Sequence, residues 1–183
     1  MALAHAQGRK VKLSIGGWTG SRFFSRGVRT APARSSFAKA ILHAYKNFDL
    51  DGIDIDWEYP NGDGAGNEKS PKDAANFLKF LKLLRKMLPP NATITAAVAL
   101  APFTGPDGQP LSDVREFADV LDWVLLMNYD VWGCESFHFD ERFATLTLIA
   151  MLAILPRLNS SLVITWTKCT LVRWVRRVTA AVR

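Results

Sequence analysis

The stretch LDGIDIDWEYP, residues 50–60, is a short apolar strand pattern interrupted by acids. Side chains alternate between the two faces of a strand, so Asp54, Asp56 and Glu58 share one face, and Ile53, Ile55 and Trp57 share the other. Neighbouring carboxylates repel one another and lose hydration when they are buried. A row of three acids on one face therefore needs a purpose.

The chain around this stretch alternates between strand-like and helix-like segments. The hydrophobic periodicity predicts strands at 10–15, 52–58, 92–100 and 122–129, and helices at 33–48, 70–88 and 112–121. Ser70 and Asp73 form a capping-box pattern at the start of the 70–88 helix. Strands that alternate with helices in this way favour right-handed crossovers and a parallel sheet. The expected fold class is α/β.

The acidic face of 52–58 has three possible uses. A half-exposed antiparallel strand would simply turn its acids to water, and three carboxylates could also bind calcium or magnesium. In a parallel sheet, however, the apolar face packs on helices and the acids point inward. Two adjacent aspartates can then share one proton, and Glu58 at the C-terminal end can act as a general acid. Parallel barrel strands carry their chemistry at that end.

Composition excludes some classes of partner. The 183 residues carry a net charge of +6, but residues 1–133 hold 16 basic and 14 acidic side chains. The body is therefore close to neutral, and nucleic-acid binding is not expected.

The apolar run 143–155 is too short to span a bilayer, and no signal peptide is visible. Cys134 and Cys169 form neither a metal spacing nor a disulfide framework. No membrane partner, metal or cofactor is predicted.

Three motifs together resemble glycoside hydrolase family 18, the chitinases and their relatives. DGIDIDWE (51–58) resembles the family's Asp-x-x-Asp-x-Asp-x-Glu signature, SIGG (14–17) its Ser-x-Gly-Gly strand, and MNYD (127–130) its Met-x-Tyr-Asp strand. The resemblance covers roughly residues 8–133 and is similar to fungal chitinases. It implies a TIM (β/α)8 barrel in which the predicted strands are the third to the sixth.

The resemblance also implies that this barrel is incomplete. A closed barrel has eight βα units and typically ~250 residues. We therefore expect a partial family 18 catalytic domain over 1–133 and an atypical hydrophobic and basic tail over 134–183, which shows no placed resemblance. An incomplete barrel lacks part of its sugar-binding wall, so the chain as given could be inactive.

The resemblance assigns a role to each acid. Glu58 would protonate the glycosidic oxygen and later activate water, while the substrate's own N-acetyl group attacks the anomeric carbon. Asp56 would orient the acetamido N–H and stabilise the oxazolinium ion, and Asp54 would hold Asp56 and share its proton. Tyr129 would place its hydroxyl against the acetamido carbonyl.

Further residues are implied around this centre. The resemblance assigns substrate binding to Trp18, Gly17, Met127, Asp130, Trp132 and Tyr59, and structural support to Ser14, Gly16 and Asp51. Phe103 is a weaker candidate for a sugar contact. The alternative for each of these aromatic residues is ordinary packing in the core, and the same holds for Met127.

The expected function is a chitinase that cleaves β-1,4-linked N-acetylglucosamine polymers with retention of configuration. Its partners would be chitin or N-acetylglucosamine oligosaccharides, and the family implies an extracellular location. Two alternatives stay open: an endo-β-N-acetylglucosaminidase, which would use the same catalytic residues, and a lectin-like relative that binds chitin without cleaving it.

Overall fold

The core of the molecule is one parallel sheet. The structure is a computed structural model that describes residues 1–101 and 103–129. The strands pair in sequence order, β1-β2-β3-β4, and all three pairings are parallel. They are β1 (Lys12–Gly16), β2 (Gly52–Asp56), β3 (Thr93–Val98) and β4 (Trp123–Leu126). The predicted α/β class with four parallel strands is thus confirmed.

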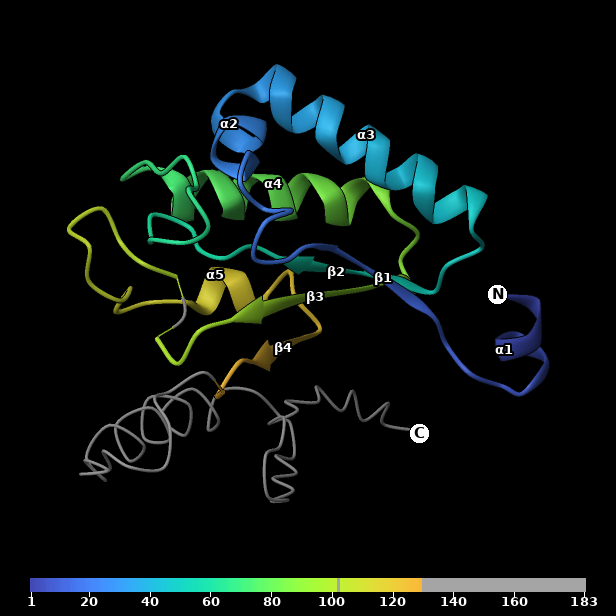
Figure 1. The fold of residues 1–183 in the computed structure, drawn as a ribbon. Helices are drawn as coiled ribbons and strands as arrows, with labels where there is room; N and C mark the ends of the chain where they lie inside the picture. Colours follow the sequence, from blue (N-terminus) through green and yellow to red (C-terminus); the bar gives the residue numbers. More distant parts are fainter. Residues whose placement is uncertain (102, 130–183) are drawn as a thin grey trace, which may run out of the picture.

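Helices connect the successive strands (Figure 1). After the short α1 (Ala2–Ala6), the chain passes from β1 through α2 (Phe24–Arg29) and α3 (Ala31–Asn47) to β2. It continues through α4 (Asp73–Met87) to β3, and through α5 (Arg115–Ala118) to β4. Figure 1 shows α2, α3 and α4 on the same side of the sheet, with α4 between α3 and the strands. The opposite face of the sheet carries the acids.

The apolar face of β2 packs against these helices, as the alternation predicts. Ile53, Ile55 and Trp57 are all fully or almost fully buried. The Trp57 ring meets Phe77 of α4 edge-on at 5.3 Å between centroids, and it meets Phe24 of α2 at 5.9 Å. Since one face of the strand is filled by these contacts, the acids must lie on the other.

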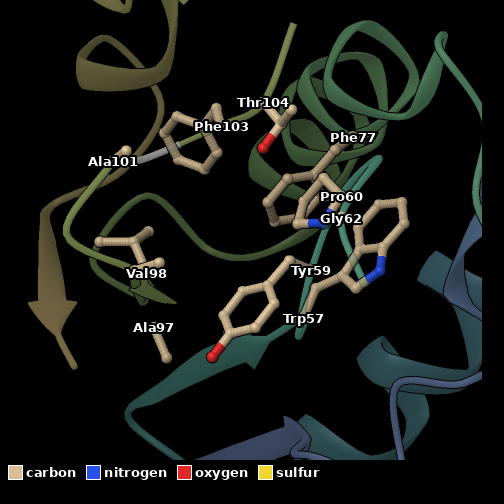
Figure 2. Close-up of a pocket in the computed structure, with 11 residues that line it drawn as sticks. Trp57, Tyr59, Pro60, Gly62, Phe77, Ala97, Val98, Ala101, Phe103 and Thr104 are labelled. Atoms are coloured by element: carbon tan, nitrogen blue, oxygen red, sulfur yellow. The ribbon is translucent and has the colours of Figure 1, made fainter. Parts of the chain in front are cut away.

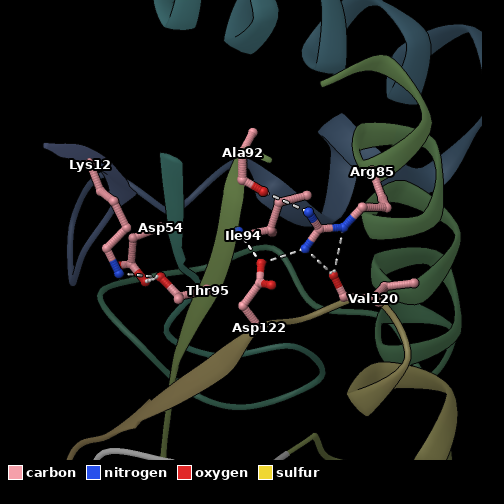
Figure 3. Close-up of polar contacts among 8 residues, drawn as sticks. All are labelled: Lys12, Asp54, Arg85, Ala92, Ile94, Thr95, Val120 and Asp122. Carbon is pink, nitrogen blue, oxygen red and sulfur yellow. Dashed lines mark hydrogen bonds and ion pairs between the residues drawn. The ribbon is translucent and has the colours of Figure 1, made fainter. Parts of the chain in front are cut away.

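Arg85 joins the end of α4 to the starts of two strands (Figure 3). Its guanidinium donates to the carbonyl oxygens of Val120 and Ala92 and forms an ion pair of 2.6 Å with Asp122. Asp122 in turn accepts from the Ile94 amide at 2.8 Å. This cluster fixes the starts of β3 and β4 relative to α4.

Several predicted boundaries differ from the structure. The helix expected at 70–88 begins at Asp73, because the Asp73 carboxylate accepts from the amides of Ser70 and Asn61 and from the Ser25 hydroxyl. Ser70 therefore lies in a turn, and the N-cap is Lys72. The helix expected at 112–121 shortens to α5, and α2 was not predicted from the sequence.

The C-terminal predictions cannot be compared with the fold. The tail 134–183, its apolar run 143–155 and both cysteines lie outside the described residues. Within the part of the chain that is described, no helix is long and apolar enough to cross a membrane.

Candidate active site

The carboxylate row runs along β2 toward its C-terminal end. Asp54 lies inside the strand and is 5 % exposed, whereas Asp56 is the last strand residue and Glu58 follows two positions later. Asp56 and Glu58 are half-buried. The row therefore leads from the interior of the sheet to its open end, where a ligand could reach it.

Asp54 is held by hydroxyl groups from both neighbouring strands. The register places Ser14 of β1 and Thr95 of β3 directly beside it. Ser14 Oγ donates to Asp54 Oδ2 at 2.7 Å, and Thr95 Oγ1 donates to Oδ1 at 2.6 Å. Lys12 Nζ in turn donates to Thr95 Oγ1 at 3.0 Å (Figure 3). Both oxygens of Asp54 are thus used, and its orientation is set.

Asp56 is the acid whose protonation the site perturbs most clearly. Burial raises the pKa of Asp56 to about 6, and the negative charges of Glu58 and Asp54 and a hydrogen bond with Glu58 act in the same direction. Asp56 Oδ1 is buried and has no hydrogen-bond partner among the described residues. Near neutral pH this carboxyl can therefore either hold or release a proton, as a relay requires.

The two glycines after β1 shape the space beside Asp56. A Cβ on Gly16 would lie 2.0 Å from the backbone oxygen of Asp56, so no side chain fits there. A Cβ on Gly17 would lie 3.8 Å from Asp56 Oδ2, an ordinary contact distance, but its φ of +86° is strained for any other residue. Both glycines therefore leave space beside Asp56.

Glu58 is held through its backbone by two loops. Its amide donates to Ser21 Oγ at 3.1 Å, from the loop after β1. Its carbonyl accepts from Asn67 Nδ2, in the loop after β2. Ser21 is completely buried. Sequence reasoning missed Ser21 and Asn67, because hydrogen bonds from a loop to a distant backbone leave no periodic signal.

An apolar pocket of about 250 Å³ is lined by Trp57 and Tyr59, the residues on either side of Glu58 in the sequence. Figure 2 shows Tyr59, Phe77 and Phe103 around it. Burial and the charge of Glu58, together with a hydrogen bond to that residue, raise the pKa of Tyr59. Phe103 is buried and stacks on Phe117 at 3.8 Å, so its exposed ring area for a sugar is small.

The remaining residues that were predicted to bind substrate lie in different parts of the structure. Trp18 is 54 % exposed directly after Gly17, so it is not packed in the core. Tyr129 is 60 % exposed just beyond β4, and it lies close enough to Tyr59 to contribute to the raised pKa of that residue. Met127, two residues before Tyr129 in the sequence, is half-buried. Asp130 and Trp132 lie outside the described residues.

Asp51 lies at the opposite end of β2 from Glu58. It accepts from the Val11 amide at 2.7 Å and pairs with His5 at 2.9 Å. The Val11 hydrogen bond, followed by interaction with His5, lowers the pKa of Asp51. This residue joins α1 and β1 to the start of β2 and does not touch the carboxylate row.

A cation site is not formed by the acids of the row. Across residues 1–101 and 103–129, no group of three or more histidine, cysteine, aspartate or glutamate side chains is arranged to hold a metal ion.

Comparison with known proteins points to one family. A profile of the family described as "Glycosyl hydrolases family 18" matches residues 1–169. A "chitinase-like effector" of Moniliophthora roreri is 44% identical over 131 residues, and "Endochitinase 1" of Metarhizium robertsii is 36% identical over 143 residues. These matches cover 71% and 74% of this chain and 32% of each relative.

A solved structure supports the same relationship. The crystal structure of a chitinase from Rhizomucor miehei superimposes with a TM-score of 0.74 at 36% sequence identity, over 81% of this chain and 49% of that one. The likeness implies that the four-stranded sheet is part of a TIM barrel. The chain spans about a third of the length of its curated relatives.

Proposed function

The chain belongs to glycosyl hydrolase family 18, and from that premise we propose that it is part of a chitinase. Its substrate would be a β-1,4-linked N-acetylglucosamine polymer, cleaved with retention of configuration. The observation that supports this proposal most strongly is the row of Asp54, Asp56 and Glu58, which runs to the open end of β2 and contains a half-buried carboxyl with a pKa of about 6. A surface strand that merely faced water would not raise the pKa of its acid in this way.

The proposed reaction uses the substrate's N-acetyl group as the nucleophile. Glu58 donates its proton to the glycosidic oxygen as the bond breaks, and the acetamido oxygen closes on the anomeric carbon to give an oxazolinium ion. Glu58, now a carboxylate, takes a proton from the water that opens this ring. Ser21 and Asn67 hold the Glu58 backbone, so the acid is positioned before the substrate arrives.

Asp56 acts on the acetamido group in this proposal. Its carboxyl accepts from the acetamido N–H and stabilises the positive charge of the oxazolinium ion. Tyr129 donates to the acetamido carbonyl, and Trp18, Tyr59 and Met127 supply apolar surface for the sugar ring and the methyl group. Asp130 and Trp132 complete the predicted set.

The decisive test is Glu58→Gln. The amide keeps the shape of the side chain but cannot donate the proton, so turnover of a chitin oligosaccharide should fall by ~10²–10⁴-fold while binding persists. Glu116→Gln is the matched control, because the Glu116 side chain is 65% exposed and lies on α5, away from the row. Hydrolysis and isothermal calorimetry would be measured on both variants. A Glu58→Gln protein that retained more than a tenth of the activity would refute the assignment.

A non-catalytic chitin-binding role is the second candidate. It is favoured by the 44% identity to a protein described as a "chitinase-like effector". The intact Glu58 favours hydrolysis. Product analysis separates the possibilities: soluble chitin oligomers indicate a chitinase, and release of a glycan from a high-mannose glycopeptide indicates an endo-β-N-acetylglucosaminidase. Binding to chitin without products indicates a lectin. The family's expected extracellular location suits each of these three roles.

A further inference from the structure

A β-turn directly follows Glu58 in the chain. It comprises residues 59–62, and the Gly62 amide donates to the Tyr59 carbonyl oxygen at 3.1 Å. Its second residue is a proline, and its third, Asn61, has a φ of +53°, which is the pattern of a type II turn. A Cβ on Gly62 would lie 2.8 Å from Tyr59 Cβ, so the turn packs closely on Tyr59. The position of Tyr59 therefore depends on the turn.

The backbone of Asn61 is bound to the helices. Its amide donates to Asp73 Oδ2 at 3.2 Å, in the first turn of α4. Asp73 is completely buried, and it also accepts from the Ser70 amide at 2.8 Å and from Ser25 Oγ of α2 at 2.7 Å. These hydrogen bonds anchor one side of the turn to α2 and α4.

The side chain of Asn61 binds a second loop, which follows β3. Asn61 Nδ2 donates to the Gly105 carbonyl oxygen at 2.7 Å, although the two residues are 44 positions apart. Residues 103–111 form a hairpin that is closed by backbone hydrogen bonds of 2.6 Å and 3.0 Å. Phe103 anchors this hairpin, because its ring is buried and stacks on Phe117 of α5. The Asn61 side chain thus joins the turn to an anchored hairpin.

The turn and the hairpin both border the apolar pocket (Figure 2). Tyr59 and Pro60 of the turn line it, and so do Phe103 and Thr104 of the hairpin. Tyr59 is half-buried, and the pocket leaves part of its ring without packing partners. Since packing does not enclose the ring, the hydrogen bonds that fix the turn, including the one from Asn61, must help to hold it.

Tyr59 interacts with the proposed catalytic acid. Burial, the charge of Glu58 and a hydrogen bond with that residue raise the pKa of Tyr59. We propose that Asn61 is a positioning residue: its bond to Gly105 fastens the turn to the hairpin and so holds Tyr59, and with it the Glu58 carboxyl, in place for proton donation. The part of this proposal that concerns proton donation rests on the proposed chitinase function, whereas the fastening of Tyr59 does not.

The test compares Asn61→Gly with Asp49→Gly. Glycine adopts the left-handed φ of position 61 without strain and removes the side-chain donor. Asp49 is the matched control, because its φ is +51°, its side chain is 87% exposed, and it precedes β2, at the opposite end of the strand from Glu58. Both substitutions add similar freedom to the unfolded backbone, so their general effects on stability should be alike.

The first readout is 19F NMR of protein labelled with 3-fluorotyrosine, which needs no turnover. The chain has three tyrosines and so gives three signals, and Tyr59→Phe identifies the signal of Tyr59. We expect this signal to shift or broaden in Asn61→Gly and to stay unchanged in Asp49→Gly. The signal of Tyr45, on α3, should stay unchanged in Asn61→Gly, which a general loosening of the fold would not allow. A folded Asn61→Gly protein with an unchanged Tyr59 signal would overturn the proposal.

The second readout is turnover of a chitin oligosaccharide. A displaced acid slows the chemical step more than it weakens binding, so kcat should fall by about 10- to 100-fold in Asn61→Gly, with a smaller change in KM. Asp49→Gly should resemble the wild type. A wild-type kcat in folded Asn61→Gly would also overturn the proposal. Absence of turnover in the wild type would refute the chitinase function alone, since the fluorine signal still tests the fastening of Tyr59.

A measurement on the wild type keeps the proposal testable if Asn61→Gly does not fold. The side-chain amide of Asn61 is hydrogen-bonded and partly buried, whereas Asn91 is exposed. In 15N-labelled protein, the side-chain amide hydrogens of Asn61 should therefore exchange with solvent more slowly than those of Asn91. Equal exchange rates for the two side chains would overturn the proposal.

Discussion

Replacing Asp56 by asparagine should stabilise the fold above neutral pH while abolishing the proposed catalysis. The Asp56 carboxyl is half-buried, one of its oxygens lacks a partner among the described residues, and it lies close to the charges of Glu58 and Asp54. The substitution keeps the shape of the side chain, removes its charge and offers an N–H to the Glu58 carboxylate. We therefore expect the aspartate that the proposed catalysis needs at position 56 to make the fold less stable than asparagine would.

The magnitude follows from the difference between the folded and unfolded pKa values of Asp56. The pKa of the Asp56 carboxyl is about 6 in the folded protein, and its ordinary value, taken here for the unfolded chain, is 3.8. Because the folded value is raised, the stability that protonation contributes is complete below pH ~4 and is lost as pH rises through about 6. At ~1.4 kcal/mol per pH unit, the loss is at most about 3 kcal/mol. Solvent screening of a half-exposed group reduces the expected gain in Asp56→Asn to about 1–2 kcal/mol at pH 8.

The measurement is urea unfolding followed by circular dichroism at pH 4 and pH 8. The two proteins should have similar unfolding free energies at pH 4, and the variant should be the more stable at pH 8. Asp63→Asn is the matched control, since the Asp63 side chain is 93% exposed, and it should change stability by less than about 0.5 kcal/mol at either pH. A gain of equal size at both pH values, or a loss at pH 8, would refute the reasoning about charge in the row.

Three further predictions concern the loops and the binding face. Ser21→Ala removes the buried hydroxyl that accepts the hydrogen bond from the Glu58 amide. It should destabilise the fold by about 1 kcal/mol and lower kcat more than it raises KM. A rise in KM alone would contradict this role. Trp18→Ala should weaken oligosaccharide binding in calorimetry by about 5- to 30-fold, as loss of an aromatic anchor does, and unchanged affinity would remove Trp18 from the sugar site. Hydrolysis by the wild type should survive exhaustive chelation, whereas loss and rescue by calcium would support a cation site.

Local patterns in the sequence were sufficient to predict the α/β architecture and to identify the acidic row. The two-residue alternation in 52–58 separates Ile53, Ile55 and Trp57 from Asp54, Asp56 and Glu58, and the structure buries the first set against the helices. Strand and helix periods alternate along the chain in the order that a parallel sheet requires. These features depend on neighbouring residues, so they can be read without knowing which strands pair. The assignment of the strands to the third to sixth positions of a barrel stays a prediction.

The partners of the acids were decided only by the tertiary structure. Thr95 is 41 residues from Asp54 and lies beside it because the parallel register pairs the two residues. Lys12 is 83 residues from Thr95 and reaches it from two residues lower in the sheet, at the level of Gly52 and Thr93. Ser21 and Asn67 reach Glu58 from loops whose conformation no periodic pattern specifies. The raised pKa of Asp56 has the same origin, since burial is its largest cause and only packing determines burial. Which residues are acidic is a local property of the chain, but the free energy of charging them depends on everything that folds around them.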